Sequence, residues 1–152
     1  MLHVFGIRGG KIRLWQATGE SYEHVLLKAL AYSIFGEGCP GLQVEVKVGL
    51  RYKPDLVAVG SDGGFDLWVE CGMVSLAKTA WLMKHTDARS IAIFKIGWHV
   101  EQYLEHLRAA IAVRYRPAGR LSVYNFVSGI TDLTASKQIS KVSPDWYSVH
   151  AV

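Results

Sequence analysis

The sequence is poor in several features that would define a class of protein. It contains 2 cysteines in 152 residues, Cys39 and Cys71, which are too few for a disulfide framework and whose spacing matches no zinc site. No apolar run reaches the ~20 residues that a membrane-spanning helix needs. The amino-terminal residues also lack the charged-then-apolar plan of a signal peptide. These absences predict a protein of the reducing cytoplasm.

The composition indicates a folded domain. Hydrophobic residues make up 50% of the chain and charged residues 20%, a balance typical of globular rather than disordered proteins. At this length we expect a single domain over residues 1–152, with its core at about 18–128. No element is predicted for residues 129–152, because they show few periodic apolar positions. The net charge of +4 is compatible with a polyanionic partner but does not identify one.

Apolar periodicity predicts an α/β fold with a mixed β-sheet. Residues 2–17 alternate as two strands around Arg8-Gly9-Gly10, which is typical of a β-hairpin. The elements expected after this hairpin are, in order, a helix at 20–35, strands at 42–48, 54–60 and 65–71, a helix at 75–86, a strand at 90–96, a helix at 100–114 and a strand at 121–127. The last two helices can supply the crossovers that parallel strands require.

The stretch from Arg51 to Lys78 carries polar residues that core packing does not explain. Asp55 opens one strand and Glu70 closes the next across a Gly-rich turn, so both acids should lie at the same end of that strand pair. Lys78 falls in the first turns of the following helix. Two carboxylates beside a lysine predict a site for Mg²⁺ (or Mn²⁺) and phosphate. Arg51 and Lys53, just before Asp55, extend this site with a positive rim for nucleic acid.

These residues occur in an order that resembles the PD-(D/E)XK nuclease superfamily. The segments ESYEHVLLKALAYSI, PDLV and DLWVECG most resemble the YaeQ-like family, and the resemblance covers roughly residues 18–96. It implies a restriction-endonuclease-like mixed sheet flanked by helices, and a Mg²⁺-dependent phosphodiesterase that acts on DNA or RNA. Carried over by position, it makes Asp55, Glu70 and Glu23 metal ligands, and it places all three with Lys78 in the catalytic set.

One position departs from the superfamily pattern. The lysine expected two residues after Glu70 is Gly72. In several branches of the superfamily this lysine has moved to the following helix, where Lys78 stands in this chain. A non-catalytic member of the same fold, which binds nucleic acid or a protein partner, is therefore the alternative function. A domain that binds no nucleic acid is a third interpretation.

Several residues keep a second interpretation at this stage. Glu20 could replace Glu23 as the acid of the first helix, although Glu23 is favoured. Cys71 as a nucleophile has no evident histidine partner, and a cysteine in a buried strand is usually a small hydrophobic residue. Trp98 and Trp146 lie in irregular surroundings where they could stack on bases. Convergence of Glu23, Asp55 and Glu70 is the observation that would favour catalysis.

Overall fold

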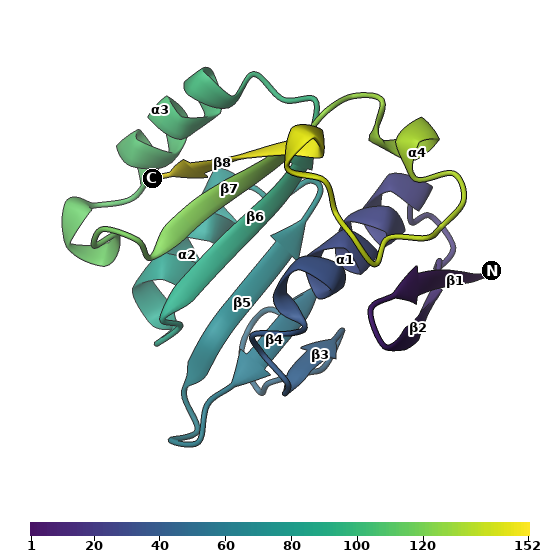
Figure 1. Ribbon diagram of the computed structural model, residues 1–152. Helices are drawn as coiled ribbons and strands as arrows, with labels where there is room; N and C mark the ends of the chain where they lie inside the picture. The colour runs from purple at the N-terminus through teal and green to yellow at the C-terminus, as the bar shows by residue number, and fades with distance from the viewer.

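The computed structural model describes residues 1–152 and contains a six-stranded mixed sheet and a separate amino-terminal hairpin (Figure 1). The strands are β1 (Leu2–Ile7), β2 (Gly10–Trp15), β3 (Leu42–Val44), β4 (Leu56–Val59), β5 (Phe65–Cys71), β6 (Ser90–Ile96), β7 (Leu121–Phe126) and β8 (Tyr147–Ala151). The α-helices are α1 (Tyr22–Phe35), α2 (Leu76–His85), α3 (Val100–Ala110) and α4 (Ile130–Leu133), and two 3-10 turns are η1 (Val113–Tyr115) and η2 (Pro144–Trp146). The predicted α/β class, mixed sheet and hairpin are confirmed.

The strands of the large sheet follow the order of the chain, from β3 through β8. The pairs β5–β6 and β6–β7 are parallel, and the other neighbours are antiparallel. Helices α2 and α3 make the two crossovers that the parallel pairs require. The carboxyl ends of β5, β6 and β7 therefore meet at one edge of the sheet, which is where ligands bind in open α/β sheets.

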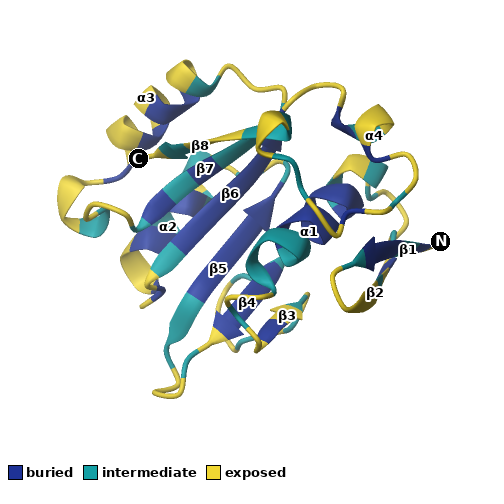
Figure 2. Ribbon diagram, viewed as in Figure 1, coloured by how far each residue is buried: buried dark blue, intermediate teal, exposed yellow.

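The two faces of the sheet pack on different helices. Helix α1 covers one face, where it buries seven consecutive residues from Val25 to Ala31, and α2 with α3 covers the other. Figure 2 shows β5 and β6 buried along most of their length between these layers. Because side chains alternate along a strand, Glu70 projects on the same face as Trp68, and Lys95 on the same face as Ile93. Glu70 and Lys95 therefore share the α2/α3 face.

Three elements differ from the sequence prediction. Strand 42–48 ends at Val44, because Glu45 adopts φ 54°, a left-handed conformation that does not continue a strand. Helix 100–114 ends at Ala110, where Ile111 turns extended. The unassigned tail contains β8, which pairs with the edge of β7. Its residues are half-buried or exposed, so no strong apolar alternation marks it.

The hairpin is held by α1 and by the loop after α4. Phe5 and Leu14 join the core that α1 forms with the sheet. The Gly6 N–H donates to the Lys137 carbonyl at 2.8 Å, and the Ile139 N–H donates to the Gly6 carbonyl at 2.8 Å. A side chain at position 6 would collide with Gln138, since a Cβ there lies 2.1 Å from Gln138 Oε1. None of the helices has the length and apolar character needed to cross a membrane.

Candidate active site at the end of strand β5

The two carboxylates predicted from the sequence lie side by side at the end of the β4–β5 pair. Leu56 pairs with Val69, so Asp55 and Glu70 are the next positions along each strand. Asp55 Oδ2 accepts a hydrogen bond from the Cys71 N–H at 2.8 Å, which fixes it to the end of β5. Glu70 is buried, and its Oε1 accepts from the Trp68 indole N–H at 3.1 Å.

The surroundings of the two acids push their pKa values apart. Burial raises the pKa of Glu70 to about 7, and the negative charge of Asp55 contributes to the same shift, against the opposing effect of Lys78. Burial also acts to raise the pKa of Asp55, but hydrogen bonds from His24 and from the Cys71 N–H outweigh it and hold this pKa below its usual value. At neutral pH Asp55 is therefore ionised, while Glu70 is near its midpoint.

Lys78 reaches this carboxylate pair from helix α2. Its Nζ lies 3.1 Å from Glu70 Oε1 and 5.0 Å from the centre of the Tyr52 ring. Ser75 caps the helix by accepting the Lys78 N–H at 3.0 Å, so the capping interaction fixes the backbone of the residue whose side chain meets Glu70. The structure therefore brings Asp55, Glu70 and Lys78 together.

Glu20, just before helix α1, is the acid that contacts His24 and Lys28. Glu20 Oε2 lies 2.7 Å from His24 Nδ1 and 2.6 Å from Lys28 Nζ, and His24 Nε2 lies 3.2 Å from Asp55 Oδ1. Glu23 is exposed and makes no ion pair. Glu23 nevertheless lines the same cavity as Glu20 and His24, so its convergence with the two strand acids stays a prediction.

Sequence reasoning missed His24, which connects Glu20 to Asp55. Its hydrogen bond with Asp55 raises the pKa of His24 against the opposing effect of burial. Lys28 extends the network, because its fully buried ammonium also lies 2.7 Å from Glu45 Oε1. The signal was partly present in the sequence: His24 and Lys28 stand four residues apart, which places them on one helix face, and Glu20 comes just before the N-cap of that helix.

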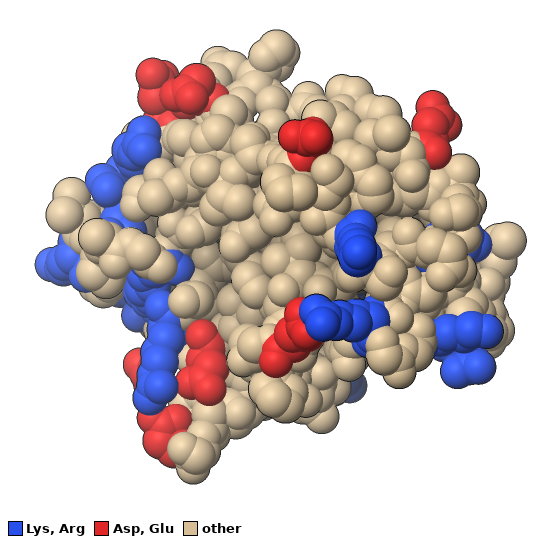
Figure 3. Space-filling view, viewed as in Figure 1, with Lys and Arg blue, Asp and Glu red and all other residues tan.

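The predicted positive rim is exposed and lies close to Lys78. Arg51 and Lys53 are both solvent-exposed, and the Arg51 guanidinium lies 5.2 Å from the centre of the same Tyr52 ring that Lys78 contacts. Elsewhere, Lys and Arg side chains gather along the left-hand edge of Figure 3, on the side where α2, α3 and η1 lie in Figure 1. The surface therefore offers cationic groups both beside the carboxylates and further away.

The donor set fits a single Mg²⁺ held mainly by water. Mg²⁺ commonly takes one or two carboxylates from a protein and completes its shell with water and substrate oxygens. Asp55 and Glu70 supply that number, and the pKa of Glu70 is raised first by burial and then by the adjacent charge of Asp55. No group of three or more His, Cys, Asp or Glu side chains in the structure could hold a metal ion. Asp55 and Glu70 would be the ligands.

Cys71 is buried next to the site but is poorly suited to nucleophilic attack. Burial raises the pKa of its thiol well above the usual value, and the nearby charges of Asp55 and Glu70 act in the same direction. The thiolate is the reactive form of cysteine, so this environment suppresses reactivity. The side chain instead belongs to the core that α1 forms with the sheet.

Comparison with known proteins identifies the fold. The chain has the mixed α/β fold of the YaeQ proteins. It superimposes on the crystal structure of YaeQ from Xanthomonas axonopodis pv. citri with a TM-score of 0.62 and 21% identity, over 83% of this chain and 67% of that one. YaeQ from Pseudomonas syringae gives a TM-score of 0.58 and 14% identity, over 82% of this chain and 65% of that one. No family model and no curated protein sequence matches the chain. This chain thus spans about two thirds of the length of each YaeQ protein.

Proposed function

We propose that the protein is a Mg²⁺-dependent phosphodiesterase that hydrolyses nucleic acid at the Asp55–Glu70 pair, in the manner of the PD-(D/E)XK nucleases. The observation that carries this proposal is the position of Lys78, whose ammonium lies 3.1 Å from Glu70 although it comes from a different element. The two carboxylates have pKa values shifted in opposite directions, and a cation lies beside them. Burying such charged groups costs free energy, which favours a functional role over packing alone.

The residues around the pair have separate roles in this reaction. Asp55 and Glu70 would hold a divalent cation, which when bound would supply an activated water and offset charge on the phosphate. His24 and the Cys71 N–H each bind one oxygen of Asp55, which keeps that carboxylate from rotating. Lys78 offsets the negative charge that develops on the phosphate in the transition state. Arg51 and Lys53 contact the flanking backbone of the substrate.

The test is cleavage of end-labelled single-stranded DNA, double-stranded DNA and RNA in Mg²⁺ or Mn²⁺. Asp55→Asn and Lys78→Met should each reduce the cleavage rate about 100-fold or more, since each removes a group that acts on the transition state. Asp132→Asn and Lys84→Met are matched controls at exposed positions on α4 and α2, and should cleave like the wild type. A wild-type protein that cleaves none of these substrates would contradict the proposal.

The same assay decides which acid of helix α1 takes part. Glu20→Gln removes the carboxylate that holds His24 and Lys28, so it should slow cleavage through the position of Asp55. Glu23→Gln changes an exposed acid outside this network and should have a much smaller effect. A larger loss in Glu23→Gln than in Glu20→Gln would restore the assignment that the sequence favoured.

One observation supports a second function, which is binding without cleavage. His24 and Lys78 already lie against the two carboxylates, so the protein itself supplies cations where a metal would bind. A domain of this kind would bind nucleic acid through its positive rim. It would show no metal-dependent cleavage, and Asp55→Asn would bind as tightly as the wild type.

A further inference from the structure

Lys95 is a buried cation without an acidic partner. It lies near the carboxyl end of β6 and is only 1% exposed, and no carboxylate lies within ion-pair distance of it. Its ammonium donates one hydrogen bond, to the Gly72 carbonyl, and otherwise lies against aromatic rings. The ring centres of Trp98 and Tyr103 are 4.1 and 5.1 Å from Nζ. An ammonium has three N–H donors, so two of them have no oxygen acceptor in the protein.

Tyr103 is a second buried donor without an acceptor in the same place. Its side chain is 5% exposed, and its hydroxyl forms no hydrogen bond. Burial raises the pKa of this phenol to about 12, so the group remains protonated and able to donate. Buried polar atoms without partners are rare in proteins and costly to maintain. Two such donors beside one tryptophan indicate that an acceptor is missing from this place.

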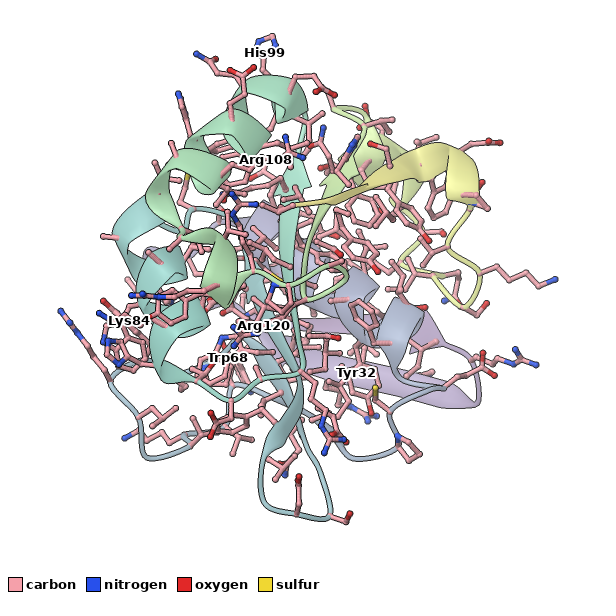
Figure 4. All side chains as sticks on the ribbon, turned by 90° about the vertical axis from the view of Figure 1, so that its left-hand side faces the viewer. Tyr32, Trp68, Lys84, His99, Arg108 and Arg120 are labelled. Carbon is pink, nitrogen blue, oxygen red and sulfur yellow. The ribbon has the colours of Figure 1, made fainter.

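Tyr103 and Trp98 line a cavity that contains no acid in its lining. It has a volume of about 380 Å³ and is formed by the turn between β6 and α3 and by the first turns of α3. Its lining residues are Gly97, Trp98, His99, Gln102, Tyr103 and His106. In Figure 4, His99 projects outward at the start of α3, far from Lys84 and Arg120. Imidazole, amide and phenol groups can all donate to an anion, and none of them repels one.

The polypeptide holds Trp98 firmly in this position. The Asn125 side chain from β7 accepts the Trp98 N–H and donates to the Trp98 carbonyl, both at 3.1 Å. The indole is nevertheless 38% exposed, and it borders both this cavity and a larger one of about 510 Å³ that runs to His24 and Gly72. Trp98 therefore separates the acid-free cavity, which Tyr103 lines, from the larger cavity, which Lys95 lines together with Glu20 and Glu23.

We propose that Lys95 and Tyr103 form a phosphate-binding subsite, with Trp98 as a stacking surface for the attached base. Lys95 Nζ lies 5.1 Å from the centre of the Tyr103 ring, so the two donors are close enough to approach one tetrahedral oxyanion, whose oxygens accept hydrogen bonds from many directions. Burial lowers the pKa of Lys95 to about 8, and a bound anion would offset the unfavourable burial of its charge. Gly72 follows Glu70 by two residues, so the subsite lies next to the carboxylates. The claim that this subsite binds the neighbouring phosphate of a cleaved strand rests on the proposed function. The claim that it binds an anion does not.

The test is calorimetric titration of inorganic phosphate and of the dinucleotide TpT in EDTA, so that no metal contributes. Both should bind the wild type. Lys95→Met, which keeps the volume of the side chain but removes the charge, should weaken both affinities about tenfold or more. Tyr103→Phe removes only the unpaired hydroxyl and should weaken them about threefold to tenfold without lowering the melting temperature. Lys84→Met is the matched control and should bind like the wild type.

The variant Trp98→Ala tests base stacking separately from phosphate binding. It should weaken TpT, which carries bases, more than it weakens inorganic phosphate, because stacking contributes only to the former. The inference would be overturned by phosphate and TpT failing to bind at tens of millimolar, or by binding that Lys95→Met leaves intact. If phosphate binds through Lys95 but no nucleic acid is ever cleaved, the subsite stands and the proposed function falls. If nucleic acid is cleaved but phosphate does not bind, the proposed function stands and the subsite falls.

Discussion

The ammonium of Lys78 lies 3.1 Å from Oε1 of the buried Glu70 carboxylate. The two residues belong to consecutive elements, α2 and β5, and Gly72 stands between them in the chain. Gly72 stands where the superfamily pattern expects a lysine, two residues after Glu70. Lys78 instead approaches Glu70 from helix α2. This relationship leads to predictions about charge, pH, metal and partner.

Removal of Lys78 should be visible in the titration of Glu70. The Lys78 charge is one of the effects that oppose burial at Glu70, so Lys78→Met should move the Glu70 pKa further above 7. The free energy of unfolding should fall by about 1–3 kcal/mol, the usual effect of losing a hydrogen bond to a charged group. NMR titration of the Glu70 carboxyl carbon measures the pKa, and urea denaturation measures the stability. An unchanged Glu70 pKa in this variant would mean that the ion pair does not form in solution.

Glu70 should make the protein more stable as the pH falls from 7 to about 5. Its pKa is raised to about 7 in the folded protein, from 4.5, so between these values the folded state binds more protons than the unfolded state. The contribution has a slope of at most about 1.4 kcal/mol per pH unit. The raised pKa of His24 adds stability at low pH, which is lost as the pH rises above 6.5. The lowered pKa of Asp55 acts in the opposite sense. It stabilises the folded protein above its usual value of 3.8, and this contribution is lost as the pH falls below that value.

Glu70→Gln should flatten this profile between pH 5 and 7, because the amide does not titrate. Denaturation by urea at half-unit pH intervals provides the comparison. Asp132→Asn, an exposed acid on α4, is the matched control and should keep the wild-type slope. A wild-type profile that rises with pH over the same interval would be incompatible with a buried, partly protonated Glu70.

Divalent cations should stabilise the protein through the same pair of acids. If Mn²⁺ binds with a dissociation constant of about 1 mM, about 10 mM Mn²⁺ adds about 1.4 kcal/mol by mass action and raises the melting temperature by about 3–5 °C. The rise should be larger at pH 8 than at pH 6, because Glu70 must lose its proton to bind. Thermal melts of the wild type and Asp55→Asn make the measurement. An equal rise in both proteins would place the cation elsewhere.

Nucleic-acid binding through the positive rim should depend strongly on salt. Arg51 and Lys53 are exposed and just before Asp55 in the chain, so each can neutralise one phosphate of a bound strand. Each neutralised phosphate contributes about −0.7 to −0.9 to the slope of the logarithm of the binding constant against the logarithm of the salt concentration. Replacing both with alanine should therefore make the slope less steep by up to about 2. Fluorescence anisotropy with a labelled single strand, between low and physiological salt, measures it. Replacing Lys84 and Arg114, both exposed and distant along the chain, should change the slope less.

The sequence predicted those features that depend on neighbours in the chain. Asp55 and Glu70 are joined by one turn, so the pairing of β4 with β5 alone brings them together. The acid near the start of α1 was equally local, and the sequence left Glu20 open as the alternative to the favoured Glu23. The role of His24 depends on α1 packing against the start of β4, which no local pattern records.

The remaining features depend on contacts between distant segments. Tyr103 is buried, but only the assembled fold shows that its hydroxyl has no acceptor. Lys95 is the one charged residue in the apolar run SIAIFKI, and its surroundings come from α3 and the turn before it. Glu45, which is left-handed, accepts a hydrogen bond from Lys28, which lies 17 positions earlier in the chain.

The position of the hairpin implies an order of assembly. Each strand of the large sheet pairs with the strand before it, so the sheet can grow as the chain is synthesised, by closing short loops. The hairpin is made first but is anchored through Gly6 to Lys137 and Ile139. Its packing on α1 can therefore form early, but these two hydrogen bonds must wait until residues 137–139 have been made. During that interval the backbone of Gly6 stays open to water and to chaperones.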